Sequence, residues 1–182
     1  MIRPAPTLSA LILALLAAPS PAIAAVDGWQ LATAQDRCLS FNTLAAGPPL
    51  QIGLLHQRGG PWITVIGTDA TASLPEGKEL TVRLEYQNGF ARREFPARVA
   101  RLGRSMVVTL AASPGSFSQF DPADISPPQA LLLVEEVGRP FTITDTATGT
   151  VLASGRVPPG FSGAFDEFLV CARTVEGNPA GR

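Results

Sequence analysis

Apolar and polar residues alternate along several short stretches in the first two thirds of the chain. In Leu80–Tyr86 an apolar side chain recurs at every second position, which predicts a strand with one buried and one solvated face. Turn-rich segments, such as Arg58–Pro61 and Gln87–Gly89, separate runs of this kind and favour hairpin connections. The predicted strands are Gly28–Thr33, Cys38–Leu44, Leu50–His56, Trp62–Gly67, Glu79–Tyr86, Phe90–Arg101 and Ser105–Ala111. This spacing is typical of an antiparallel sandwich or an open barrel.

The last third of the chain changes to a helical pattern. Ser126 and Pro127 precede the segment Gln129–Val137 and Gly138 follows it, which are the start and stop signals of a helix. A hairpin of Phe141–Thr144 and Val151–Ala153 comes next. The final helix is predicted over Ser162–Arg173, with an apolar stripe of Phe161, Phe165, Phe168, Leu169 and Ala172 that we assign to the core. The sequence thus predicts an α+β fold dominated by antiparallel sheet, with a short helix and a C-terminal helix.

Residues 1–24 have the features of a secretory signal peptide. Arg3 supplies the basic start, Leu8–Ala18 is an apolar run, and Ala22–Ala24 fits a cleavage site. The alternative, a membrane anchor, is disfavoured because the run is shorter than the roughly 20 residues of a span and because prolines interrupt it. We expect cleavage after Ala24, a single domain over 25–174, a flexible tail over 175–182, and location in the periplasm, with secretion as the alternative.

Composition and charge exclude several classes of protein. The 182 residues are 46% hydrophobic and 16% charged, which is too apolar for a disordered chain. The formal net charge of −1 gives no concentrated basic face for nucleic acid. After signal cleavage no apolar stretch is long enough to span a bilayer.

The two cysteines, Cys38 and Cys171, lie near opposite ends of the predicted domain. In an exported chain this favours a disulfide bond between them. Two separate buried thiols are an alternative. A metal site is disfavoured because the cysteines and the lone His56 form no cluster with ligand spacing.

Two residues are candidates for nucleophilic catalysis, Ser162 and His56. Gly160–Ala164 resembles a nucleophile elbow around Ser162, but its last glycine is replaced by alanine and no histidine follows it. We therefore expect Ser162 to be the N-cap of the last helix and His56 to be a solvated turn residue, and we assign no catalytic residue.

Carboxylates offer another possible chemistry. The candidates are Asp121, Asp124, Glu135–Glu136 and Asp166–Glu167. Glycoside hydrolysis needs two carboxylates roughly 5 to 10 Å apart, and the sequence places no pair there. Acids adjacent on a helix are usually its solvated face.

Positive charge is concentrated in one segment: Arg92, Arg93, Arg98, Arg101 and Arg104. Arginine forks match phosphates and carboxylates, so this cluster is a possible site for an anionic envelope component. The alternative is the wet face of two strands, paired with Glu79 and Glu85. No dinucleotide, phosphate-loop, C-x-x-C or H-E-x-x-H motif occurs, and we expect neither cofactor nor metal.

Short motifs resemble the invasion-associated locus B family of small exported bacterial proteins. The matching pieces are Trp29 and Cys38, Leu74–Gly77, and Gly160–Phe165 at the start of the last helix; the family's additional internal cysteines have no counterpart. The resemblance implies an exported, mostly β domain and carries over no catalytic residue. Our leading hypothesis is a non-enzymatic periplasmic domain that binds an envelope component or protein. The alternatives are an envelope hydrolase that uses Asp or Glu carboxylates and an inhibitor of a secreted enzyme.

Overall fold

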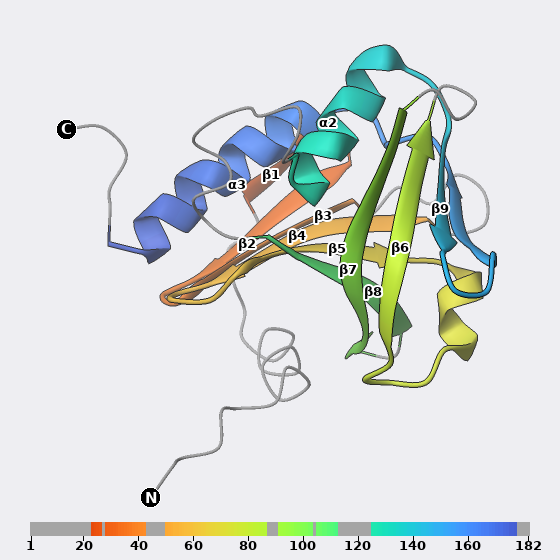
Figure 1. Cartoon of the computed structure of the whole chain (residues 1–182). Coiled ribbons are helices and arrows are strands. Elements are labelled where there is room, and N and C mark those ends of the chain that lie inside the picture. Colours follow the sequence, from red (N-terminus) through yellow and green to blue (C-terminus); the bar gives the residue numbers. More distant parts are fainter. Residues whose placement is uncertain are drawn as a thin grey trace, which may run out of the picture.

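The computed structural model describes residues 23–26, 28–42, 50–86, 91–103, 105–112 and 125–177 (Figure 1). Its strands are β1 Ile23–Val26, β2 Trp29–Ala34, β3 Arg37–Asn42, β4 Gln51–Gln57, β5 Trp62–Gly67, β6 Glu79–Tyr86, β7 Ala91–Leu102, β8 Ser105–Ala112, β9 Phe141–Asp145 and β10 Val151–Gly155. Its helices are the 3₁₀ turn η1 Asp69–Ser73 and the α-helices α2 Pro127–Val137 and α3 Phe161–Val175. The predicted α+β class with a mainly antiparallel sheet is confirmed.

All the described strands belong to one open sheet. Their order is β1-β2-β3-β4-β5-β8-β7-β6-β9-β10, and every neighbouring pair is antiparallel. One continuous sheet therefore replaces the two stacked sheets of a sandwich. It bends strongly: in Figure 1, β6, β7 and β9 stand upright while β3, β4 and β5 run across the view.

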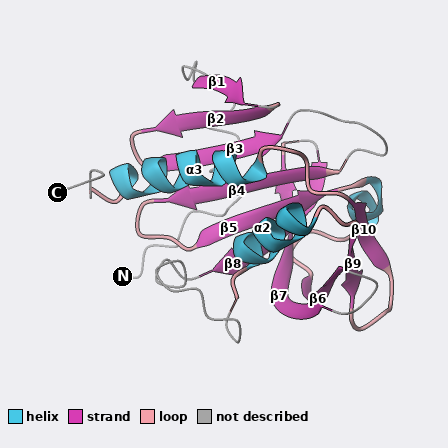
Figure 2. Ribbon diagram, turned by 90° about the horizontal axis from the view of Figure 1, so that it is seen from above, coloured by secondary structure: helices cyan, strands magenta, loops and turns pink. Residues whose placement is uncertain are grey.

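Both α-helices lie on the same face of the sheet, which we call the inner face (Figure 2). Helix α3 packs on β2, β3 and β4, and α2 contacts α3 and β8. The aromatic stripe of α3 is buried as predicted: Phe161 lies 5.3 Å from Trp29 and Phe168 lies 5.5 Å from Trp62, measured between ring centroids. Neither α2 nor α3, the α-helices of the described part, has the length and apolar character of a membrane span.

Helix α2 forms where its punctuation predicts. Ser126 is the N-cap, Pro127 needs no amide hydrogen there, and the side chain of Gln129 accepts a hydrogen bond from the Ser126 amide at 2.9 Å. The helix ends at Gly138, whose φ of 64° is left-handed and suits glycine.

The start of α3 differs from the prediction. Its N-cap is Gly160, and Ser162, expected to be the cap, is the second helical residue and exposed. The cap comes from α2: the two carboxylate oxygens of Glu135 accept the amides of Phe161 and Ser162, both at 2.8 Å. A carboxylate placed here satisfies two unpaired amides and faces the positive end of the helix dipole. The prediction that Ser162 caps α3 was wrong, because Glu135 on helix α2 accepts the free amides at the start of α3.

The predicted disulfide between Cys38 and Cys171 is present and joins β3 to α3. Cys38 is fully buried. The two residues are 133 positions apart, so the bond closes most of the folded chain into one loop. In the chain-entropy account such a loop stabilises the folded state by at most about 5 kcal/mol.

Several expectations concern residues that lie outside the described part. These are the segment 1–22 of the predicted signal peptide, the predicted turn Gln87–Gly89, Arg104, and the acids Asp121 and Asp124. The predicted cleavage site falls within β1, because Ile23 pairs with Leu31 and Val26 with Trp29. Cleavage after Ala24 would leave two residues of this edge strand.

The cap of α3 gives a test of stability. Replacing Glu135 with alanine should lower the free energy of unfolding by about 1 to 2 kcal/mol, because two amides lose their acceptor. Glu136→Ala, on the exposed side of α2, is the matched control, and Ser162→Ala should also leave stability nearly unchanged. Urea unfolding monitored by circular dichroism measures all three. A larger loss in Ser162→Ala than in Glu135→Ala would contradict this assignment.

The disulfide gives a second test. The double variant Cys38→Ala/Cys171→Ala should unfold at a lower temperature than the oxidised wild type. Its free energy of unfolding should be lower by several kcal/mol. A reductant should lower the melting temperature of the wild type and leave that of the variant unchanged. Labelling of two free thiols in the denatured, unreduced wild-type protein would show that the bond does not form.

Candidate functional site

His56 is one of the most deeply buried polar residues described. Its exposed fraction is 0%, and its ring lies 5.6 Å from that of Trp62 on the inner face of the sheet. The expectation of a solvated turn residue was therefore wrong. The reason is register: His56 pairs with Cys38 and Trp62 across the ladder, and all three side chains face α3.

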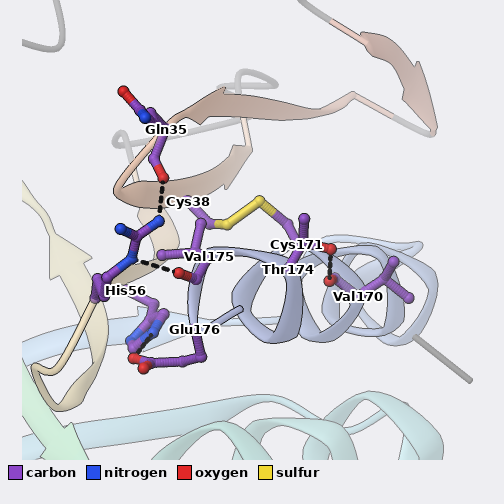
Figure 3. The surroundings of a disulfide bond; sticks show 9 residues. Gln35, Cys38, His56, Val170, Cys171, Thr174, Val175 and Glu176 are labelled. Atoms are coloured by element: carbon purple, nitrogen blue, oxygen red, sulfur yellow. Dashed lines mark hydrogen bonds and ion pairs between the residues drawn. A yellow bond between two sulfur atoms is a disulfide. The ribbon is translucent and has the colours of Figure 1, made fainter. Parts of the chain in front are cut away.

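The partner of His56 is the carboxylate of Glu176, directly after α3 (Figure 3). Oε1 of Glu176 lies 2.9 Å from Nε2 of His56 and accepts the amide of Gly59 at 2.8 Å. Because an ionised carboxylate only accepts, Nε2 carries the proton in this pair. The chain is thus fixed to the fold as far as Glu176, whereas the tail was expected to begin at residue 175.

Arg58 completes this attachment of α3, which we call the C-terminal clamp: Arg58, His56, Glu176 and the disulfide. Its guanidinium donates to the carbonyl of Val175 at 2.6 Å and to that of Gln35 at 2.8 Å. Two hairpin turns and the end of α3 are thereby joined beside Cys38 (Figure 3). Each of these contacts holds elements together, and we assign the clamp to stability.

Ser162 and His56 lie at opposite ends of α3. Ser162 is in the first turn, whereas His56 contacts Glu176 beyond the last turn. A helix of 15 residues is roughly 22 Å long, so these two side chains do not form a nucleophile–base pair. The prediction that neither residue is catalytic remains a prediction, and this separation favours it.

The carboxylate candidates described are also dispersed. Glu135 caps α3, while Asp166 and Glu167 lie exposed on the outside of that helix. Among the described residues, no group of three or more His, Cys, Asp or Glu side chains is placed to hold a metal ion.

The arginine cluster is divided by the strand it lies on. Successive side chains of β7 point to opposite faces, so Arg92 and Arg98 share the outer face while Arg93 and Arg101 lie on the other. Arg92 pairs with Glu85 at 2.9 Å, as the wet-face alternative expects, and Arg101 pairs with Glu76 at 3.1 Å. Arg92 and Arg98 are six residues apart, roughly 20 Å along a strand. The described arginines do not converge on one small anion.

The structure instead shows a groove on the outer face, where β8 and β7 separate. Its volume is about 1080 Å³. Ile63, Ala100, Thr109, Ala111 and Pro96 lie along it, and Arg98, Glu79, Lys78, Glu76 and the turn Asp145–Ala147 border it. We call this the outer groove. It adjoins a small apolar cluster of Val65, Ala100 and Val107, packed with Ile63 and Leu102 on the same face.

The groove arises from the end of the β7–β8 ladder. This ladder runs from Leu102–Ser105 to Arg98–Thr109 and stops, although both strands continue. Val99 exchanges main-chain hydrogen bonds with Gly77 and Lys78 on the β6 side. By alternation, the main chain of Pro96 faces β8, and proline has no amide hydrogen to continue the ladder. The sequence pattern predicts an uninterrupted strand over Phe90–Arg101, and Pro96 is the local signal that β7 does not pair on both sides.

The acids of the outer groove are held by local partners. Burial raises the pKa of Asp145, but the Ala147 amide, the Thr148 hydroxyl and the Lys78 ammonium outweigh it, and the pKa lies below its ordinary value. Lys78 Nζ is 3.6 Å from this carboxylate, and Glu76 pairs with Arg101. A general acid at neutral pH requires a raised pKa, which is the opposite of the shift at Asp145.

The clamp makes stability depend on acidity. The Gly59 amide, followed by the hydrogen bond and charge of His56 and the charge of Arg58, outweighs partial desolvation and holds the pKa of Glu176 below its ordinary value of 4.5. A lowered folded pKa contributes stability above pH 4.5, and this contribution is lost as the pH falls through the folded pKa. Glu176→Gln should therefore be less stable than wild type at pH 7, and the difference should shrink below pH 4.5.

Urea midpoints from pH 7 to pH 3 measure this dependence. Glu167→Gln, an exposed carboxylate on α3, is the control for general charge effects. A difference between Glu176→Gln and wild type that stays constant over this range would contradict the assigned contacts.

Comparison with known proteins adds no assignment to this geometry. No protein-family model, curated protein or solved structure shows significant similarity to the chain. The function must therefore be argued from the described residues themselves.

Proposed function

We propose that this protein is an exported, non-enzymatic domain of the periplasm that binds a protein partner in the outer groove. The observation that carries the proposal is the groove itself: an apolar floor on the sheet face opposite both α-helices, bordered by charged side chains. Apolar surface at the centre and polar groups at the rim are the usual arrangement of a protein interface.

The apolar floor supports binding of a partner more than a purely structural role. Ile63 is only partly buried, and Pro61, Pro96 and Ala111 are exposed on this face. Contiguous apolar surface of this kind often marks an interaction site. Ala100 and Ala111 line the groove with single methyl groups, which are too small to fill it.

The disulfide supports the proposed location. A bond between the fully buried Cys38 and the partly buried Cys171 fits an oxidising compartment. Export also agrees with what the resemblance to the invasion-associated locus B family implies.

Two alternatives are less favoured. An envelope hydrolase would need a carboxyl kept protonated near neutral pH, and Asp145 in the groove is held ionised. An anionic envelope component would favour a surface on which the arginines converge, and the described arginines divide between two faces.

The proposal predicts where a partner contacts the protein. A photo-crosslinking amino acid at Ala111, in the groove, should give covalent adducts with a partner protein in intact cells of the source bacterium. The same amino acid at Ala34, exposed on β2 and away from the groove, should give none. Adducts are detected as shifted bands and identified by mass spectrometry. Adducts from both positions in equal yield, or from neither, would count against the groove as the binding site.

A further inference from the structure

We propose that the outer groove receives an extended segment of its partner and that a carboxylate on this segment pairs with Arg98. The inference rests on the proposed function and specifies its ligand. It draws on three observations: the charge state of the groove, the open strand edges, and the size of the space.

Arg98 differs from the cations around it. Lys78 is paired with Asp145, Arg101 with Glu76, and Arg92 with Glu85. The exposed side chain of Arg98 has no hydrogen bond or ion pair with any described residue. Its guanidinium lies against Gly77, where an added Cβ would come within 3.8 Å of Nη2. An unpaired guanidinium beside an apolar floor is a receptor for a carboxylate, which it can bind through two parallel hydrogen bonds.

Glu79 modulates this receptor. It lies opposite Arg98 in the β6–β7 register, on the same face, and forms no ion pair with it. The negative charge of Glu79 lowers the affinity of the Arg98 site for an anion. Removing this charge should raise that affinity. The pair therefore offers two substitutions on one face with opposite expected effects.

The open edges of β7 and β8 favour an extended ligand. Beyond Arg98 and Thr109 the two strands no longer pair with each other. A segment lying here can form main-chain hydrogen bonds with β8 at Ala111, whose amide and carbonyl face the gap by alternation, while Pro96 offers only its carbonyl on the β7 side. The volume of about 1080 Å³ slightly exceeds the roughly 300 to 1,000 Å³ of small-molecule pockets, which favours a peptide segment.

The charges around Arg98 argue against a membrane surface. Glu76, Glu79 and Asp145 border the same groove as Lys78 and Arg98, so the groove has no excess of positive charge to attract a layer of anionic headgroups. A single carboxylate on a narrow segment can reach Arg98 between these acids. The occupant we argue for is therefore a peptide segment of a protein.

An array of random immobilised heptapeptides tests the inference with the mature protein. Peptides bound by the wild type should be enriched in Asp or Glu. Arg98→Gln should reduce binding to these peptides about two- to fivefold, the size expected of an exposed ion pair, and remove the enrichment. Glu79→Gln should strengthen the same binding. Arg92→Gln, on the same strand and face but outside the groove, is the matched control and should bind as the wild type does.

The outcomes separate this inference from the proposed function. All three altered side chains are solvent-accessible, and melting curves verify that each variant folds. If crosslinking at Ala111 captures a partner while Arg98→Gln selects the same acidic peptides as wild type, the carboxylate inference is wrong and the binding function stands. Absence of any bound peptide, or binding to vesicles of anionic phospholipid that Arg98→Gln abolishes, would also overturn it.

Discussion

The missing amide hydrogen of Pro96 determines where the sheet opens and therefore where the outer groove lies. The main chain of this residue faces β8, so the ladder between β7 and β8 ends at Arg98 and Thr109. Pairing with β6 continues along the whole of the upstream part of β7. The sheet therefore opens between β8 and β7 beyond Arg98 and Thr109, and the outer groove forms at this opening. The two strands stay paired from Arg98–Thr109 to Leu102–Ser105.

Helix α3, on the inner face, is fixed at both of its ends. The disulfide, Arg58 and the His56–Glu176 contact fix the end of α3 to β3 and to two hairpin turns. At the start of the helix, Glu135 supplies the cap. These contacts lie on the inner face, whereas the outer groove lies on the opposite face. Substitutions of exposed groove residues can therefore change binding with little effect on stability.

Local patterns were sufficient for the elements of the fold. Alternation along β6 and the punctuation of α2 are carried by neighbouring residues, and both elements form where predicted. The attachment of α3 depends on partners far apart in the sequence: 120 residues separate His56 from Glu176, and 27 separate Ser162 from the carboxylate that binds its amide. No local pattern encodes such pairs. The arginine cluster is continuous in the sequence, but the alternation of faces along β7 divides it, and Pro96 is the local signal of the groove.

Cross-strand proton contacts measured by NMR test the opening of the sheet most directly. Non-hydrogen-bonded pairs of an antiparallel ladder bring Cα atoms to about 4.5 Å and give strong contacts between α-protons. We expect these contacts for Val99 with Val108 and for Arg101 with Met106, which are paired across β7 and β8. We expect none for Ala97 with Leu110, the next pair in the same register. A contact between Ala97 and Leu110 as strong as the other two would show that the ladder continues past Pro96, and would contradict the origin of the groove.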